Sequence, residues 1–386
     1  MHIYDYIIIG SGLTGLTIAK KIQQETDNIL ILEAQEVAGG DNRPVGLNSF
    51  ILDNGLRFMP ASDVSKNALN FLGELVEVDL ASGEVLENLI ETYEASGFKK
   101  FVGFGAKPPE FYEQLSYFLS QNEIPFRMAP HQWVAKLAHA LQSKIQPRSI
   151  VTRFGFENLD SEKPQLTHVM VNGTKQIYGR NFIFAGAPKD LALLVPDDIL
   201  SIRAKTKLKK SAAWQGVCLD IAHKVSIEKK NLFLLNGTTD DDLGPCIGRF
   251  HGAVSQWMSF IDSEFAEDTE NIGMVLKKMK RQIKRAFPDV GEAIVKERIF
   301  VTPALSGADL KLNANGTLPK VDNLWVASSQ VSPYKNILGS LAQARFILSS
   351  LGFMPAQNLI EPAIAQEIGF IEDPVVDSEF AESVLE

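Results

Sequence analysis

The sequence has few cysteines and histidines, and none of its apolar runs is long. Among 386 residues only Cys218 and Cys246 are cysteines, which allows one disulfide but neither a disulfide framework nor a four-cysteine zinc site. The six histidines lack the spacing of metal ligands, so we expect no metal. No apolar stretch approaches the roughly 18 residues of a membrane-spanning helix. No basic residue precedes the apolar run at 7–9, as one would in a signal peptide. These absences favour a cytoplasmic protein.

Acidic residues outnumber basic residues in this chain. Lys and Arg total 38 against 47 Asp and Glu, a formal charge of −9. Seven of the acids and no base lie in 367–386, so the rest of the chain is near neutral, which disfavours a nucleic-acid partner. We interpret the densest basic stretch, 203–210, as a solvated surface; contact with a membrane surface is the less favoured alternative. The oligomeric state stays open.

The N-terminal segment shows the pattern of a βαβ unit. Residues 4–9 predict a short buried strand, 10–15 a glycine loop, 16–24 an amphipathic helix and 29–32 a second strand. Two strands joined by one helix within about 30 residues pair in parallel, with the helix as the crossover. The segment therefore predicts part of a parallel α/β sheet.

The rest of the chain changes character along its length. Helices are expected over 65–75, 84–95, 133–141, 271–287 and 337–351. Strand-like stretches separated by turn residues, at 212–225, 232–235, 244–250 and 255–261, predict an antiparallel sheet. The expected fold is α/β: a Rossmann-like domain with a second α+β domain, for the substrate, built on that antiparallel sheet. We place the first domain at 1–65, 130–196 and 301–355, the second at 66–129 and 197–300, and an acidic tail at 356–386.

The glycine loop carries the chemistry that can be inferred from local spacing. Gly10, Gly12 and Gly15 match G-x-G-x-x-G between a predicted strand and a predicted helix. The glycines permit a tight turn, close approach of a pyrophosphate and close helix packing, while the helix N-terminus faces the phosphates. Glu33 ends the second strand, where a carboxylate can accept hydrogen bonds from both ribose hydroxyls and repels a 2′-phosphate. The pattern predicts a dinucleotide site that disfavours NADP.

A second group of glycines indicates a long cofactor. Gly39 and Gly40 follow Glu33 closely, Arg43 comes three residues later, and Asp53 and Gly55 follow. A simple NAD fold has no physical need for this second pair, whereas a cofactor that runs on past its pyrophosphate does. Arg43 could offset phosphate charge there.

These motifs together resemble the FAD site of the flavin amine oxidase superfamily, which includes amine oxidases, protoporphyrinogen oxidases and phytoene desaturases. Weaker similarity continues at 149–151, at 181–188 and at 323–344, where a helix would point its N-terminus at the flavin. Ser328 and Ser329 stand where the family has Gly-Glu or Gly-Asp. The resemblance implies FAD as the cofactor and implies these cofactor-binding residues: Gly10, Gly12, Leu13, Thr14, Gly15, Glu33, Ala34, Gly39, Gly40, Arg43, Leu56, Arg57, Phe58, Val151, Ala185, Ser328, Ser329, Ile337 and Leu338.

The substrate half offers few catalytic candidates, because in flavin enzymes the cofactor carries the chemistry. The resemblance implies that Arg57 lies near the ring, where it could bind either an anionic substrate group or the flavin edge; a surface arginine is an equal alternative. Lys335 could hold a water near the flavin, with Tyr334 beside it, although a solvated lysine is the simpler interpretation.

The sequence is thus interpreted as an FAD-dependent oxidoreductase of the amine oxidase type. It would oxidise a C–N or C–C bond of a small molecule by hydride transfer to flavin N5, with dioxygen or another molecule as the electron acceptor. Two alternatives remain: a non-redox flavoenzyme similar to UDP-galactopyranose mutase, and a binding or assembly protein that keeps the fold without catalysis.

Overall fold

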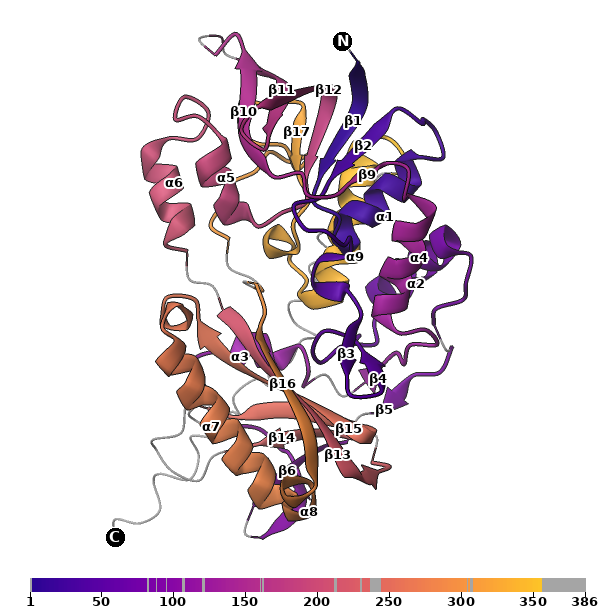
Figure 1. Cartoon of the computed structure of the whole chain (residues 1–386), viewed down its shortest axis with the longest axis vertical. Helices are drawn as coiled ribbons and strands as arrows, with labels where there is room; N and C mark the ends of the chain where they lie inside the picture. Colours follow the sequence, from indigo (N-terminus) through magenta and orange to yellow (C-terminus); the bar gives the residue numbers. More distant parts are fainter. Residues whose placement is uncertain are drawn as a thin grey trace, which may run out of the picture.

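The computed structural model describes residues 2–355 except 82, 88, 95, 106–107, 120–121, 160, 162, 212–213, 230, 237–243, 304 and 306–307. The acidic tail predicted at 356–386 lies outside the described residues. The described residues form two large sheets, which are the basis of the two halves of the molecule, one above the other in Figure 1.

The upper half is built on a mostly parallel sheet. Its described strands run in the order β10-β11-β12-β1-β2-β9, and β17 pairs with the last residues of β12. β1, β2, β9, β12 and β17 are parallel, whereas β10 and β11 form an antiparallel edge. The bounds are β1 Ile3–Ile9, β2 Ile29–Leu32, β9 Ile145–Gln146, β10 Val151–Glu157, β11 Gln165–Val171, β12 Lys175–Phe184 and β17 Leu324–Val326.

Helices cover both faces of this sheet, which explains its apolar strands. Along β1, Ile8 packs into one core cluster and Ile7 and Ile9 into another, because alternate side chains point to opposite faces. The first face carries α1 (Leu13–Ile22), α2 (Asp63–Val76), α4 (Pro130–Ala140) and α9 (Asn336–Ser350). The other face carries α5 (Pro188–Leu194) and α6 (Ile202–Lys209), on the left in Figure 1.

The lower half is built on a mostly antiparallel sheet in the order β16-β13-β15-β14-β6-β7, and among its described residues only the β14–β6 pair is parallel. The bounds are β6 Ile90–Glu94, β7 Gly97–Lys100, β13 Trp214–Ile227, β14 Leu232–Leu235, β15 Cys246–Asp262 and β16 Ile294–Val301. α7 (Thr269–Ala286) and α8 (Pro288–Glu292) cover one face. Cys218, Met258 and Phe260 on the other face join the core cluster that also lies under α1 and α9, so the two halves share one apolar interior.

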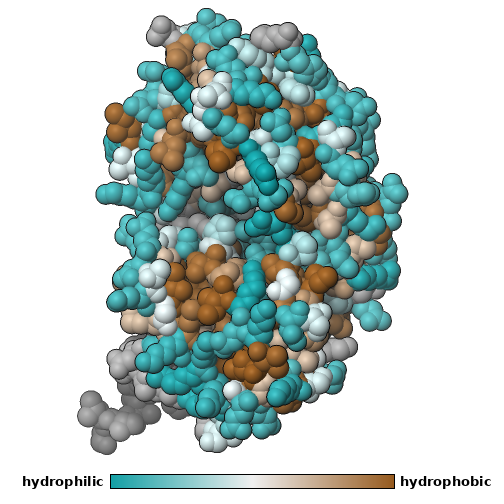
Figure 2. Space-filling view, viewed as in Figure 1, coloured by the Kyte–Doolittle hydropathy of each residue, from teal (hydrophilic) through white to brown (hydrophobic). Residues whose placement is uncertain are grey.

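Shorter elements connect these layers: η1 Gly40–Asn42, β3 Val45–Leu47, β4 Phe50–Leu52, β5 Leu86–Glu87, α3 Tyr112–Ser116, β8 Asn122–Glu123, η2 Phe265–Glu267 and η3 Ser329–Val331. The visible face is mostly hydrophilic, and apolar residues gather in patches on its lower half (Figure 2). No helix among the described residues has the length and apolarity needed to cross a membrane.

The predicted fold class is confirmed, with corrections to single elements. The helix expected over 84–95 is wrong: β5 and β6 lie there, and Ile90 and Thr92 alternate as buried residues with more exposed neighbours. The strands expected at 244–250 and 255–261 are one strand, β15, which continues through Gly252 at φ +64°. α2 packs on α1, α4 and α9, so this helix lies with the upper half although a boundary at residue 66 places most of it in the substrate domain. Cys218 and Cys246 are both buried free thiols.

Candidate functional site

A cavity of about 700 Å³ opens at the carboxyl ends of β1, β2 and β12. In open parallel sheets this edge is where ligands bind. Of the residues implied by the resemblance, these line the cavity: Gly10, Gly12, Leu13, Thr14, Glu33, Ala34, Gly40, Arg57, Val151, Ala185, Ser328, Ser329 and Ile337. The structure thus brings together segments separated by more than 300 positions in the chain.

The glycine loop forms one wall of this dinucleotide cavity. A Cβ at Gly15 would lie 2.2 Å from the Gly10 carbonyl oxygen, so only glycine lets α1 approach the loop this closely. A Cβ at Gly12 would meet nothing within 4 Å, which leaves a cradle for a ligand beside the loop. No side chain caps the N-terminus of α1, so its first N–H groups and the positive end of its dipole are available to an anion.

Glu33 lies at the other end of the cavity and is held by three protein donors. The backbone N–H of Ser11 donates to Glu33 Oε2 at 3.0 Å, the Ser11 hydroxyl bonds to the same oxygen, and the N–H of Gln35 donates to Oε1 at 2.7 Å. Glu33 as a whole is 7% exposed. This arrangement fixes the carboxylate at the end of β2, where its remaining lone pairs can accept hydrogen bonds from ribose hydroxyls.

The second glycine pair forms the turn that leads into η1. Gly39 and Gly40 both have positive φ, at +124° and +55°, and a Cβ at Gly40 would lie 3.1 Å from the Gly12 Cα. The pair thus lets η1 press against the first glycine loop. Arg43, expected to offset phosphate charge, donates from Nε to the Gly40 carbonyl oxygen at 3.0 Å and does not line the cavity.

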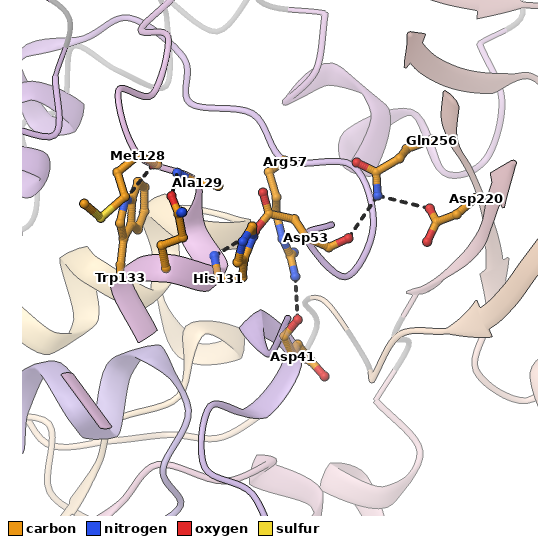
Figure 3. A network of polar contacts seen from close by, with 10 residues as sticks. Asp41, Asp53, Arg57, Met128, Ala129, His131, Trp133, Asp220 and Gln256 are labelled. Carbon is orange, nitrogen blue, oxygen red and sulfur yellow. Dashed lines mark hydrogen bonds and ion pairs between the residues drawn. The ribbon is translucent and has the colours of Figure 1, made fainter. Parts of the chain in front are cut away.

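Arg57 reaches the cavity from the segment after Gly55. Its Nη2 donates to the carbonyl oxygen of Asp41 at 2.7 Å, as Figure 3 shows. Its buried Nε has no hydrogen-bond partner, and neither has the buried Oδ1 of Asn42, which also lines the cavity. A buried polar atom without a partner is costly unless a ligand satisfies it. The cradle at Gly12, the open helix end and these two atoms therefore fit a polar, phosphate-bearing cofactor.

A polar network holds the segment that carries Arg57 (Figure 3). The backbone N–H of His131 donates to Asp53 Oδ1 at 2.7 Å, and His131 Nδ1 lies 2.9 Å from the same oxygen. Gln256 Nε2 donates to the Asp53 carbonyl oxygen at 2.9 Å and to Asp220 Oδ1 at 3.1 Å. Asp53 is thereby tied to α4 on one side and to the lower sheet on the other.

The network continues into β16. Arg298 donates to Asp220 Oδ2 at 2.9 Å and also to the Asn54 side chain. Asp220 is completely buried. Burial raises the pKa of Asp220 above its ordinary value, although hydrogen bonds from Gln256 and Arg298 and the charge of Arg298 oppose the rise.

The N-terminus of α9 closes the far end of the cavity. Asn336, Ile337 and Ser340 line it, no side chain caps the helix, and the Thr14 hydroxyl donates to the Ser340 carbonyl oxygen at 3.3 Å. Two uncapped helix N-termini, of α1 and α9, thus open into one cavity. Lys335 turns away: its Nζ donates to the carbonyl oxygen of Glu113 at 3.1 Å and pairs with the Glu113 carboxylate at 3.3 Å.

Eight of the predicted site residues do not line this cavity: Gly15, Gly39, Arg43, Leu56, Phe58, Leu338, Tyr334 and Lys335. Gly15 and Gly39 lie just behind the wall and shape the turns, and Leu56, Phe58 and Leu338 are buried in the core cluster below it. Tyr334 packs against that cluster.

Residues that the sequence analysis did not name as cofactor-binding also line the cavity, among them Ser11, Asn42, Ser149, Pro303 and Leu305. Ser11 and Asn42 lie inside the two glycine motifs and could have been included on spacing alone. Pro303 and Leu305 carry no local signal, because they reach the cavity from the segment that follows β16.

Comparisons with known proteins agree with this geometry. Residues 8–75 match the model of an NAD(P)-binding Rossmann-like domain. A 74-residue stretch is 34% identical to "Possible lysine-specific histone demethylase 1" of Drosophila melanogaster, and covers 19% of this chain and 8% of that protein. The match therefore spans only a small part of that relative's length.

Solved structures match over most of the chain. Putrescine oxidase bound to putrescine aligns over 90% of this chain and 98% of its own, with a TM-score of 0.59 and 11% identity. An oxidoreductase from Methanosarcina mazei aligns over 89% and 100%, with a TM-score of 0.62 and 13% identity. NikD, an amino acid oxidase, aligns over 93% and 96%, with a TM-score of 0.59 and 11% identity.

The described residues thus form two large sheets, with a cavity at the carboxyl edge of the parallel one and an NAD(P)-binding Rossmann-like match over its first strands. The fold is shared with putrescine oxidase and the amino acid oxidase NikD, in agreement with the resemblance to flavin amine oxidases. Identities this low establish the fold and leave the reaction to be argued from the site.

Proposed function

We propose that the chain binds FAD in the dinucleotide cavity and is an FAD-dependent oxidoreductase. The observation that carries this proposal is the extent of the cavity. It runs from Glu33 past the uncapped end of α1 to Arg57 and the uncapped end of α9. A mononucleotide would fill only the Glu33 end, whereas FAD has a pyrophosphate for α1 and a ring system for α9.

Each end of the cavity has residues suited to one portion of the cofactor. Glu33 would accept hydrogen bonds from the adenosine ribose, and Val151, at the start of β10, lines the cavity near it. The N–H groups at the start of α1 would bind the pyrophosphate. Ser328 and Ser329 line the stretch between, where their hydroxyls are suited to ribityl hydroxyls.

The ring end would be served by Arg57 and α9. FAD, when bound, supplies the group that accepts a hydride and its two electrons from the substrate. The guanidinium of Arg57 and the positive end of the α9 dipole would stabilise the negative charge that the ring gains on reduction. Pro303 and Leu305, from the segment after β16, also line the cavity, and their apolar side chains would help to exclude water from it.

The proposed reaction is oxidation of a C–N or C–C bond in a small molecule, followed by reoxidation with dioxygen or another acceptor. Catalytic roles for Tyr334 and Lys335 receive no support from the geometry, because neither lines the cavity and Lys335 is paired with Glu113. Arg57 is the candidate that the cavity retains.

The test is a visible spectrum of the purified protein, recorded before and after anaerobic addition of a panel of amines and other donors. Flavin bands that one donor bleaches would support an oxidoreductase and identify its substrate class. Flavin that no donor bleaches would favour the non-redox alternative. Failure of the protein to take up FAD would overturn the proposal and favour a binding or assembly protein that keeps the fold without catalysis.

A further inference from the structure

Asp41 places a carboxylate in the wall of the dinucleotide cavity. It belongs to η1, and its neighbours Gly40 and Asn42 line the cavity with it. A Cβ at Gly40 would lie 3.1 Å from the Gly12 Cα, and consecutive Cα atoms are about 3.8 Å apart, so Asp41 lies beside the Gly12 cradle. A diphosphate bound in that cradle is an anion, and an ionised carboxylate beside it would repel it. The proposed function gives this side chain no role.

The Asp41 carboxylate has no direct partner among the residues that the structure describes. The Asp41 carbonyl oxygen accepts the 2.7 Å hydrogen bond from Arg57 Nη2 that Figure 3 shows, but no described residue forms a hydrogen bond or an ion pair with the carboxylate itself. Arg43 donates from Nε to the Gly40 carbonyl oxygen instead. Asp41 is exposed, and because it lines the cavity, part of its surface faces the space that a dinucleotide would fill. The carboxylate is therefore left without a direct counter-ion at the place where an anion is expected to bind.

The surroundings of Asp41 favour the neutral form of its carboxyl group. Burial of this group in the cavity wall raises the pKa of Asp41 above its ordinary value, although the charges of Arg57 and Arg43 oppose the rise. A diphosphate would add negative charge beside the carboxyl group and displace water from the wall, and both changes raise the pKa further. Cofactor binding and protonation of Asp41 therefore favour each other.

The other titratable groups nearby are already engaged or belong to a different element. α4 packs against η1 and carries His131, whose Nδ1 lies 2.9 Å from Asp53 Oδ1. Glu33 lines the cavity and is held by three protein donors. Asp190 also lines the cavity, and burial raises its pKa too, but it belongs to α5. Asp190 is therefore a matched comparison for Asp41, because it is the same side chain in the same cavity on another element.

We propose that Asp41 couples FAD binding to proton uptake, so that the protein holds its cofactor more tightly at lower pH. This inference rests on the FAD site proposed above and adds the regulation of that site. One proton moves from solvent to a carboxylate oxygen of Asp41, no bond of the cofactor is broken, and the carboxyl O–H can then donate to a phosphate oxygen. The positive end of the α1 dipole then attracts the phosphates with no carboxylate opposing it.

The direction of the pH dependence follows from this coupling. Because the complex holds more protons than the free protein, the affinity for FAD should fall as the pH rises between the pKa of Asp41 in the free protein and its higher pKa in the complex. The fall should approach about tenfold for each pH unit, which is the limit for one proton. Below that window Asp41 is protonated in both states, and above it Asp41 is ionised in both, so the affinity should be constant on either side.

The experiment is titration of the apoprotein with FAD between about pH 5 and about pH 8, followed by flavin fluorescence. Calorimetry in two buffers that differ in their heat of ionisation counts the protons taken up at each pH. Asp41→Asn cannot take up this proton, so it should bind FAD several-fold more tightly than the wild type at the alkaline end and lose the pH dependence. Asp190→Asn should keep the dependence and the proton uptake of the wild type.

Several results would contradict the coupling while leaving the FAD site in place. They are FAD binding by the wild type without proton uptake, an unchanged pH dependence in Asp41→Asn, and a dependence that disappears in Asp190→Asn instead. Binding that millimolar Mg²⁺ tightens in the wild type and not in Asp41→Asn, without proton uptake, would mean that a cation rather than a proton neutralises the carboxylate. Failure of the wild type to bind FAD at any pH would overturn the proposed function itself, and this inference with it.

Discussion

At the residue scale, the two glycines at the start of α1 have different tasks, and substitution can separate them. A Cβ at Gly15 would clash with backbone at 2.2 Å, whereas a Cβ at Gly12 would project into open space. We expect Gly15→Ala to lower the free energy of unfolding by about 1–3 kcal/mol, because overpacking outweighs the better helix propensity of alanine. We expect Gly12→Ala to fold normally and to bind FAD at least tenfold more weakly, since its methyl group occupies the cradle.

Thermal unfolding of the apoprotein and FAD titration measure the two effects independently. Gly46→Ala is the control, because a Cβ there also meets nothing within 4 Å but Gly46 does not line the cavity. If Gly12→Ala bound FAD as tightly as the wild type, the cofactor would not approach this loop.

A second residue-scale prediction concerns Asp220. Burial raises its pKa in the folded protein above the unfolded value, so between those two pKa values the native state holds a proton that the unfolded state has lost. The contribution of this group to stability therefore falls as the pH rises through that window. Asp220→Asn cannot ionise, so we expect it to gain stability relative to the wild type as the pH rises from about 4 toward neutral.

Chemical denaturation of both proteins across this pH range gives the difference directly. Asp79→Asn is a matched control, because Asp79 pairs with Arg127 at the surface, with its side chain 62% exposed. A wild type that gains stability over Asp220→Asn as the pH rises would show that the Arg298 pair outweighs burial.

The residue scale also shows which site residues a sequence can provide. Gly10, Gly12 and Glu33 are recognisable because their task depends on local turns and strand ends. Arg43 and Lys335 have the right position in the chain, but each side chain turns to a nearby carbonyl oxygen, of Gly40 and of Glu113. The spacing of residues in the sequence does not show which way such a side chain points.

At the element scale, β15 shows how a long strand can be mistaken for two. Gly252 divides the apolar pattern and has φ +64°, in the left-handed region. The strand nevertheless continues, because Gly252 pairs with Ile227 across an irregularity in β13. The error at 84–95 has a similar origin. In β6 buried residues alternate with less buried ones, two of which are glutamates, and the acidic character of the segment masked this strand pattern. In both cases the secondary structure depends on pairing with another strand, and a short stretch of sequence does not contain that partner strand.

This reasoning gives a prediction for the strand. A residue with a branched side chain is strained at positive φ, so Gly252→Val should lower the free energy of unfolding by about 1–2 kcal/mol or more. Gly252→Asn should cost less, because asparagine tolerates the left-handed region. Denaturant unfolding of the two variants measures the difference. Equal stability of the two would mean that space beside Gly252, rather than its backbone conformation, limits the site.

At the scale of the whole molecule, the dinucleotide cavity depends on contacts between the two halves. Gln256 and Arg298 of the lower sheet hold Asp53 and Asn54, and the same segment continues to Arg57 in the cavity. The halves also share one apolar core cluster. Cofactor affinity should therefore respond to residues that never contact the cofactor.

Arg298→Met tests this coupling. Removing the guanidinium leaves Asp220 buried without its cation, which should lower the free energy of unfolding by about 3–5 kcal/mol. We also expect FAD to bind several-fold more weakly, because the segment that carries Arg57 loses its anchor at Asn54. Asp220→Asn combined with Arg298→Met should restore most of the stability, since no unpaired buried charge remains. It should not restore the affinity, because the bond to Asn54 is still absent.

Arg127→Met is the control. It breaks an exposed pair, so it should cost less than about 1 kcal/mol of unfolding free energy and leave FAD binding unchanged. Recovery of affinity together with stability in the double variant would mean that folding alone, and not the position of the 53–57 segment, links Arg298 to the cavity.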